Sequence, residues 1–101
     1  MLKHLRNIIH FLEKKIVKKS IETSFTRDLK LGSEGSDVKL LQEYLNNHGF
    51  IIAKSGAGSK GKEVDKFGPA TKAALIRFQK YKGITPANGY FGPKTMESMD
   101  K

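Results

Sequence analysis

The chain of 101 residues contains no cysteine and no long uninterrupted apolar stretch. The absence of cysteine excludes a disulfide framework, a thiol nucleophile and a thiolate metal site. A membrane-spanning helix needs about 20 apolar residues, and no segment approaches that length, so no transmembrane segment is predicted. The best apolar run near the N-terminus, at positions 8–12, contains His10 and is followed by charged residues. No signal peptide is therefore predicted.

The usual patterns of catalytic and metal-binding residues are also missing. His4 and His10 are six positions apart, which places them on different sides of a helix, and no carboxylate stands at a zinc-ligand spacing. His48 has no evident orienting partner of the kind that nucleophilic catalysis requires. Segment 56–63 is similar to a phosphate-binding loop, but Glu63 replaces the required hydroxyl. The sequence predicts neither an enzyme nor a metal or other cofactor.

Acidic residues are few compared with basic ones. The chain has 19 Lys and Arg against 10 Asp and Glu, which gives a formal net charge of +9. Such an excess favours an anionic partner, whether a wall polymer, a lipid surface, nucleic acid or an acidic protein. Because no nucleic-acid-binding motif is present, nucleic acid has the weakest support among these partners.

The first part of the chain has the pattern of a basic amphipathic helix. Over residues 2–19, Leu5, Ile9, Leu12 and Ile16 recur at the three- and four-residue spacing of a helix. Three interpretations are open: the stripe docks on its own domain, packs on a protein partner or a second copy, or lies on an anionic membrane surface. We therefore divide the chain into a helix and linker at 1–24 and a domain at 25–101.

Turn residues predict the first helix of that domain. A connector ends at Ser36, a residue suited to capping a helix that we expect at about 37–48. Gly49 stands where a left-handed residue commonly ends a helix. Residues 50–53 are interpreted as a short strand, and 55–62 as a glycine-rich loop.

Two further helices are predicted from paired glycine and proline. Gly68 and Pro69 begin the second helix, which ends at Gly83, and Gly92 and Pro93 begin a short third helix. Proline loses nothing at the first helical position, and the preceding glycine is expected to provide backbone room. The expected fold is all-α, with three helices in the domain and one N-terminal amphipathic helix before it.

A short phrase occurs twice within this domain. Both copies contain a glutamine followed, after a variable interval, by Phe-Gly-Pro-x-Thr. A unit this short cannot easily bury its apolar face alone, so the two copies are expected to pack together. The repeated structural positions are Gln42, Gly68, Pro69 and Thr71 in the first copy and Gln79, Gly92, Pro93 and Thr95 in the second.

This pattern resembles the peptidoglycan-binding domain type 1 family over about three quarters of the chain. The resemblance implies a non-catalytic three-helix module that binds peptidoglycan in a shallow groove between helices. The first copy departs from the compact pattern because Phe50 and Phe67 are far apart, whereas Ile84 and Phe91 are close. An inserted loop is therefore expected to cover or extend the groove.

The repeated polar and aromatic residues suggest different roles. A buried amide costs free energy unless it is paired, so Gln42 and Gln79 are predicted to bond backbone groups of the neighbouring Phe-Gly-Pro turn rather than a ligand. Aromatic rings can stack on sugar or peptide, and the basic groups of Arg77, Lys80 and Lys82 can meet carboxylates of wall peptides. The alternatives are core packing and a solvated helix face. The groove candidates are Tyr44, Arg77, Lys80, Tyr81, Tyr90 and Phe91.

The primary functional hypothesis is a non-catalytic peptidoglycan-binding module of a bacterial or phage protein, with its groove near the second copy. Its partner would be peptidoglycan or another anionic wall polymer. The alternative is a structural or adaptor protein, for example of a phage particle, that holds a protein partner through the same fold and the basic helix. The absence of a predicted signal peptide favours the alternative. A phage component would satisfy both hypotheses, and the sequence assigns no compartment beyond suspected wall contact.

Overall fold

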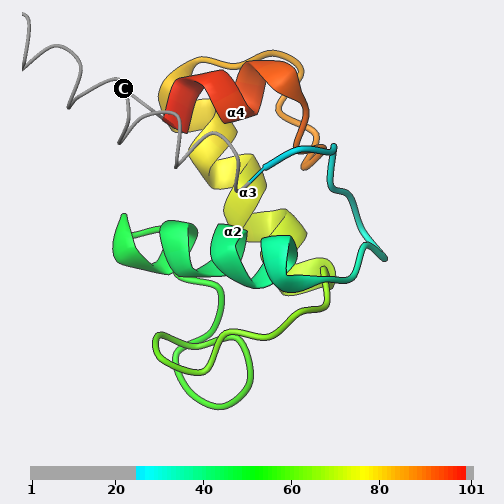
Figure 1. Ribbon diagram of the computed structural model, residues 1–101. Coiled ribbons are helices and arrows are strands. Elements are labelled where there is room, and N and C mark those ends of the chain that lie inside the picture. Colours follow the sequence, from blue (N-terminus) through cyan, green and yellow to red (C-terminus); the bar gives the residue numbers. More distant parts are fainter. Residues whose placement is uncertain (1–24, 100–101) are drawn as a thin grey trace, which may run out of the picture.

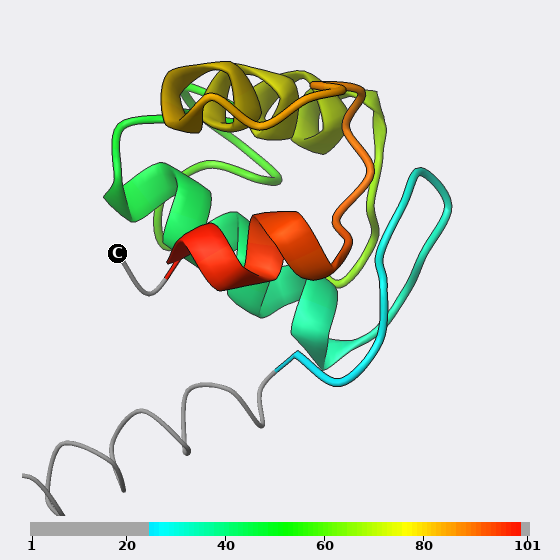
Figure 2. The same cartoon turned by 90° about the horizontal axis from the view of Figure 1, so that it is seen from above.

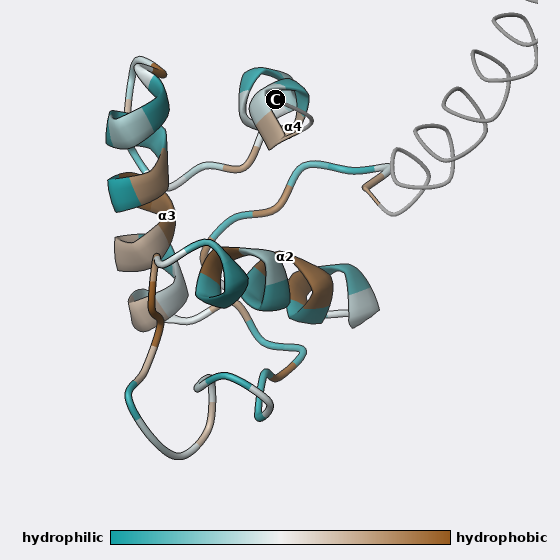
Figure 3. Ribbon diagram, turned by 90° about the vertical axis from the view of Figure 1, so that its left-hand side faces the viewer, coloured by the Kyte–Doolittle hydropathy of each residue, from teal (hydrophilic) through white to brown (hydrophobic). Residues whose placement is uncertain are grey.

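The computed structural model describes residues 25–99, which form three helices joined by ordered loops. The helices are α2 (Ser36–Asn47), α3 (Pro69–Lys82) and α4 (Pro93–Met99). Helices α2 and α4 lie on the same side of α3, at different levels along it (Figures 1 and 3). Within 25–99 there is no strand, so the predicted all-α class is confirmed. The helix predicted at 2–19 lies outside the described residues.

The helix ends follow the local chemistry of the sequence. Pro69 and Pro93 are the first residues of α3 and α4, as their fixed φ angle favours. Helix α3 ends before Gly83, whose φ of 73° is left-handed, and Gly49 after α2 has a φ of 87°. The predicted starts of α3 and α4 and the end of α3 are therefore confirmed.

One apolar core joins the three helices and the loops between them. Its fully enclosed side chains come from α2, α3, both Phe-Gly-Pro turns and the segment before α2, and brown stretches of the ribbon in Figure 3 mark the hydrophobic residues of the helices. Met96 and Met99 of α4 pack against the same cluster. The buried hydrophobic residues are Leu29, Val38, Leu41, Leu45, Phe67, Ala74, Leu75, Phe78 and Phe91.

The segment at 25–35 belongs to the folded domain and is more than a connector. Leu29 is fully buried and exchanges two backbone hydrogen bonds with Phe91, of 3.0 and 2.8 Å. Further along, Gly32 N donates to Phe67 O, and Phe67 N donates to Ser33 O, both at 2.9 Å. This segment therefore ties the two Phe-Gly-Pro turns together along one edge of the domain (Figure 2).

The start of α2 differs from the predicted serine cap. Gly35 is the capping residue, and Ser36 is the first helical residue, so the predicted role of Ser36 is wrong. Asp37 stabilises this end instead, since its carboxylate accepts a hydrogen bond from Val38 N at 3.0 Å and pairs with Arg27 Nε at 2.8 Å. The hydrogen bond from Arg27 is the main cause that lowers the pKa of Asp37.

The segment at 50–66, which we call the first-repeat loop, does not contain the strand predicted at 50–53. Ile52 N donates to the side-chain Oδ1 of Asn46 at 2.9 Å and not to a neighbouring strand. The Nδ2 of Asn46 donates to Gly58 O at 2.9 Å and to Glu63 Oε2 at 2.8 Å. The buried side chain of Asn46 thus bonds the backbone groups that a neighbouring strand would have bonded, and the glycine-rich loop folds around this side chain.

Candidate functional site

A buried glutamine organises the first repeat. The Nε2 of Gln42 donates to Lys66 O at 2.8 Å and to Thr71 Oγ1 at 3.0 Å. Its Oε1 accepts a hydrogen bond from Val64 N at 2.8 Å. We call these four residues the Gln42 network. The network attaches helix α2 to the turn that begins α3, which is the backbone role predicted for this amide.

The second repeat contains a network with the same hydrogen-bond pattern. The Nε2 of Gln79 donates to Tyr90 O at 2.8 Å and to Thr95 Oγ1 at 3.1 Å, and its Oε1 accepts from Gly89 N at 2.8 Å. We call these residues the Gln79 network. Both glutamines are 1% exposed. In each glutamine the amide nitrogen donates two hydrogen bonds to protein groups and the amide oxygen accepts one, so neither side chain is free to bind a ligand.

The two glycines before the prolines have different surroundings. A Cβ added at Gly92 would lie 3.0 Å from Tyr90 Cε2, whereas one added at Gly68 would meet nothing within 4 Å. The expectation that both positions need backbone room therefore applies to Gly92 alone. Its absent side chain leaves space for the ring of Tyr90.

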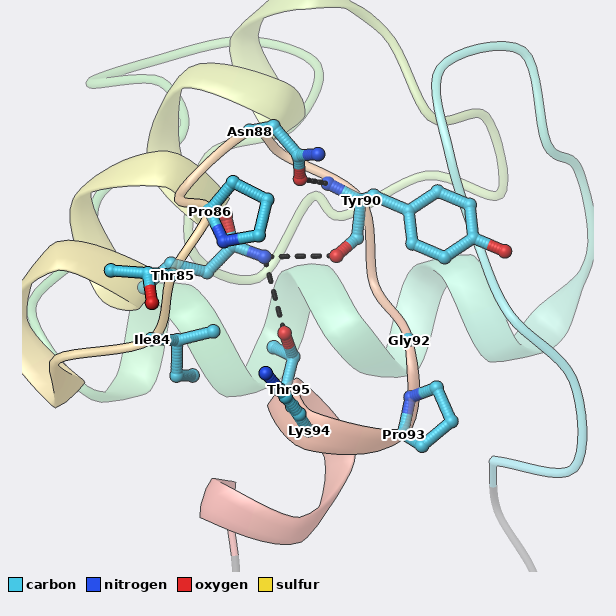
Figure 4. Close-up of a pocket in the computed structure, with 10 residues that line it drawn as sticks. Ile84, Thr85, Pro86, Asn88, Tyr90, Gly92, Pro93, Lys94 and Thr95 are labelled. Atoms are coloured by element: carbon cyan, nitrogen blue, oxygen red, sulfur yellow. Dashed lines mark hydrogen bonds between the residues drawn. The ribbon is translucent and has the colours of Figure 1, made fainter.

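A pocket of about 460 Å³ lies between the second-repeat loop, residues 84–90, and the start of α4 (Figure 4). Thr85 and Pro86 lie on the loop side, while Pro93 and Lys94 lie on the α4 side. The lining residues are Gln79, Ile84, Thr85, Pro86, Asn88, Tyr90, Gly92, Pro93, Lys94 and Thr95.

A second pocket of about 410 Å³ adjoins the first, because both are lined by Ile84, Thr85 and Lys94. It extends toward the end of α3 at Lys82 and along α4 to Ser98. We call the two together the second-repeat groove. Two lysines and one glutamate line it, so its ionisable side chains have a positive excess.

Besides Lys82, which is predicted to meet peptide carboxylates and lines the second pocket, Tyr90 is the one predicted groove candidate in the lining. Its side chain is 42% exposed, and its hydroxyl donates to Asp28 Oδ2 at 2.6 Å. That hydrogen bond is the main cause that raises the pKa of Tyr90 above the ordinary value of a tyrosine. Asp28, which is distant from Tyr90 in the sequence, therefore holds the ring of Tyr90 at the groove.

The two other predicted aromatics near the core have structural contacts. Phe91 is completely buried and packs edge-on against Phe25, with ring centroids 5.0 Å apart, so its proposed place on a groove surface is wrong. Its burial follows from the backbone pairing with Leu29, which turns the ring inward. The ring of Tyr44 stacks on that of His48, with centroids 3.9 Å apart, and its hydroxyl donates a hydrogen bond to Met99 O at 3.2 Å. Neither residue lines the second-repeat groove.

The remaining candidates lie on α3 away from the groove lining. Arg77 donates to Ile51 O at 2.6 Å, and Lys80 is exposed. Tyr81 is 76% exposed, and its ring centroid is 5.7 Å from that of Phe50. None of these three residues lines the groove, and any ligand contact through them stays a prediction.

Sequence reasoning missed Thr85, Pro86, Asn88 and Lys94 as groove residues. None of them has a repeated counterpart with the same role, so the repeat did not draw attention to them. The available signal was the short interval between Gly83 and Gly92, which leaves a loop too small to cover the space beside α4.

The loop that is similar to a phosphate-binding loop has a structural role. Glu63 accepts hydrogen bonds from Asn46 Nδ2 and from Gly61 N, at 2.8 and 3.0 Å. The bond from Asn46 is the main cause that lowers the pKa of Glu63. In the part of the chain that the structure describes, no three potential metal ligands gather in one place. Across 25–99, no helix has the length and apolar character that crossing a bilayer requires.

Comparison with known proteins identifies the class of this domain. Residues 34–99 match the family described as "Putative peptidoglycan binding domain", and this match covers more than half of the chain. The chain therefore belongs to the peptidoglycan-binding domain family. Among solved structures it is similar to the SleB N-terminal domain, with 30% identity and a TM-score of 0.61. That similarity covers 75% of this chain and 92% of the other. No curated protein matches the sequence.

Proposed function

We propose that this protein is a non-catalytic module that binds peptidoglycan through the second-repeat groove. Family membership carries the proposal, because the matched residues 34–99 include every residue that lines the groove. The first pocket of the groove has the form of a small binding site with mainly apolar walls, and the adjoining second pocket adds charged and polar groups. Tyr90 gives it an aromatic wall of the kind that contacts sugar or peptide.

The groove residues support binding without bond cleavage. Glycosidases of the common type need two carboxylates on either side of the scissile bond, and Glu97 is the single carboxylate in this lining. The lining also contains no histidine that could activate a serine or hold a metal. Its side chains can contact and orient a polymer but offer no catalytic pair.

Charge supports an anionic polymer as the partner. Residues 25–99 contain twelve Lys and Arg against seven Asp and Glu. Long-range attraction of this kind raises the rate at which a wall fragment meets the protein, while the groove contacts select it. Salt screens the first effect much more than the second.

Sedimentation with purified insoluble peptidoglycan tests the proposal. The full chain is expected to pellet with peptidoglycan at low salt and to remain largely bound at high salt, with no release of soluble fragments. Thr85→Trp, which places an indole at the groove, should weaken binding about 10-fold or more because it occupies the space. Ser55→Trp, in the exposed first-repeat loop, is the matched control and should bind normally.

Two results would contradict the proposal. Complete loss of binding at high salt for the parent chain would indicate non-specific charge attraction only. Equal binding by Thr85→Trp and Ser55→Trp, with both variants folded by circular dichroism, would exclude the second-repeat groove as the site.

A further inference from the structure

The deepest polar groups of the second-repeat groove are already used within the protein. The amide of Gln79 and the hydroxyl of Thr95 bond each other, and Gln79 makes two further bonds to backbone groups. Both side chains are at most 2% exposed. A glycan has many hydroxyl groups that lose hydrogen bonds with water on binding, and the base of this groove offers few replacements.

The walls of the groove suit small alkyl groups. Ile84, Pro86 and Pro93 supply aliphatic surface on both sides of the first pocket (Figure 4). Tyr90 is the single aromatic residue in the lining, and its hydroxyl is held by Asp28. Burying methyl groups against such walls is favourable at about 25 cal/mol per Å² of apolar surface.

The edge of the groove suits a negative charge. Lys94 at the start of α4 and Lys82 at the end of α3 both line the second pocket, and Glu97 is the single carboxylate beside these two cations. Within 25–99 neither ammonium group has an ion pair or a hydrogen bond to a protein group. The ammonium of Lys82 lies 6.0 Å from the ring centres of Phe78 and Tyr81, at the outer limit of a cation–π contact. Both lysines can therefore turn toward a carboxylate.

We propose that the groove binds the carboxylate-ended peptide stem of peptidoglycan and not its glycan strand. The inference rests on the proposed function and adds the chemical class of the ligand. The methyl groups of the terminal alanines pack between Pro86 and Pro93, and the terminal carboxylate accepts charge-assisted hydrogen bonds from Lys94 and Lys82. The glycan then remains outside the groove.

Titration of the full chain with matched soluble probes tests this assignment. The probe is an N-acetylated Lys-D-Ala-D-Ala tripeptide with a free carboxylate, compared with the same peptide as its C-terminal amide. The free acid should shift the NMR signals of Thr85 and Lys94, and amidation should weaken binding about 10-fold, because a charge-assisted bond is lost. Glycan strands without peptides and a glycerol-phosphate oligomer should leave those signals in place.

Charge variants locate the carboxylate. Lys94→Glu should weaken binding of the free acid about 10-fold or more, while Lys94→Arg should stay within about threefold of the parent. Lys60→Glu changes the net charge equally but lies in the first-repeat loop, so it should bind like the parent. Thermal melts of all three variants verify that they are folded.

The outcomes separate this inference from the proposed function. If insoluble peptidoglycan binds but the groove signals respond to the glycan or to the phosphate oligomer and not to the peptide, the stem assignment is wrong and the function stands. Equal affinity for the acid and the amide, or no difference between Lys94→Glu and Lys60→Glu, also overturns the assignment. If neither insoluble peptidoglycan nor the tripeptide binds, both proposals fail.

Discussion

The two repeats have the same hydrogen-bonded frame but enclose very different loops. In each repeat a glutamine joins one helix to the turn and threonine that begin the next. Seventeen positions separate Phe50 from Phe67 in the first repeat, whereas seven separate Ile84 from Phe91 in the second. The frame is therefore independent of the loop length that it encloses.

The difference in loop length assigns different roles to the two halves. The first-repeat loop folds on Asn46 and buries Gly58 and Ser59, so its residues are used to complete the domain. The second-repeat loop is too short to cover the start of α4 and leaves the pocket of about 460 Å³. The first-repeat loop thus completes the fold, whereas the second repeat leaves open the groove that we propose as the binding surface.

The largest expected effect comes from removing the two glutamines. Gln79→Leu should lower the free energy of unfolding by about 3 kcal/mol, and Gln42→Leu by about 2 kcal/mol, because each leaves polar groups unpaired. Gln79 should cost more, because the backbone N–H of Gly89 that bonds its Oε1 is buried, whereas the corresponding N–H of Val64 is only partly buried. Urea unfolding measures both values. Equal losses, or a larger loss for Gln42→Leu, would contradict the proposed asymmetry.

Local chemistry explains why much of this frame could be predicted. Pro69 and Pro93 fix their own backbone angles, and Gly83 tolerates a left-handed conformation, so α3 and the start of α4 are visible in the sequence. A buried glutamine must find partners, and its repeated position beside a turn indicates which ones. These predictions depend on residues close together in the chain or on the repeat itself.

Long-range pairing explains what could not be predicted. The burial of Leu29 depends on its backbone pairing with Phe91, 62 positions away, and no periodic pattern in the sequence predicts that pairing. The same pairing turns Phe91 into the core and away from the groove. The strand expected at 50–53 is reduced to an isolated bridge between Ala53 and Ser59, and Asn46 supplies the hydrogen bond to Ile52 that a neighbouring strand would supply. The groove is open because the second-repeat loop is short. A short loop has no sequence motif that would predict a groove.

A smaller effect is expected from adding one methyl group to each turn. Gly92→Ala should destabilise the domain by about 1 kcal/mol, because the new Cβ pushes the ring of Tyr90. Gly68→Ala should change stability by less than about 0.5 kcal/mol, since that position is open. Thermal melts of the two variants give the comparison. A greater loss for Gly68→Ala would show that the turns differ in some other way.

Acid should affect the first-repeat loop before the second. The folded pKa of Glu63 is lowered, so its contribution is present above the ordinary glutamate value of about 4.3 and is lost as the pH falls through the folded pKa. Residues 84–92 contain no acidic side chain, and the carboxylate of Asp28 bonds the side chain of Tyr90 and not the backbone of this loop. Amide exchange at Gly58 and Gly61 should therefore accelerate below about pH 4, while exchange at Gly89 changes less.

Replacing the carboxylate provides the control for this pH effect. Glu63→Gln should make exchange at Gly58 and Gly61 nearly independent of pH over the same range, apart from the intrinsic chemical rate. Asp37, whose pKa is also lowered, remains in that variant. Any pH dependence of exchange that is left at the start of α2 is therefore assigned to Asp37. If the second-repeat loop opens first on acidification, the assignment of acid sensitivity to Glu63 is wrong.

The smallest effect is expected for Tyr81, although it is the most exposed aromatic side chain on α3. Tyr81→Ala should change stability by less than about 0.5 kcal/mol and leave peptidoglycan binding within twofold, because its ring lies outside the groove lining. Tyr90→Ala is the matched aromatic deletion and should weaken binding severalfold, since it removes a groove wall. Sedimentation with insoluble peptidoglycan measures both. If Tyr81→Ala instead weakens binding more than Tyr90→Ala does, the ligand surface lies beside Phe50 and Arg77, and the comparison of the two repeats no longer explains where binding occurs.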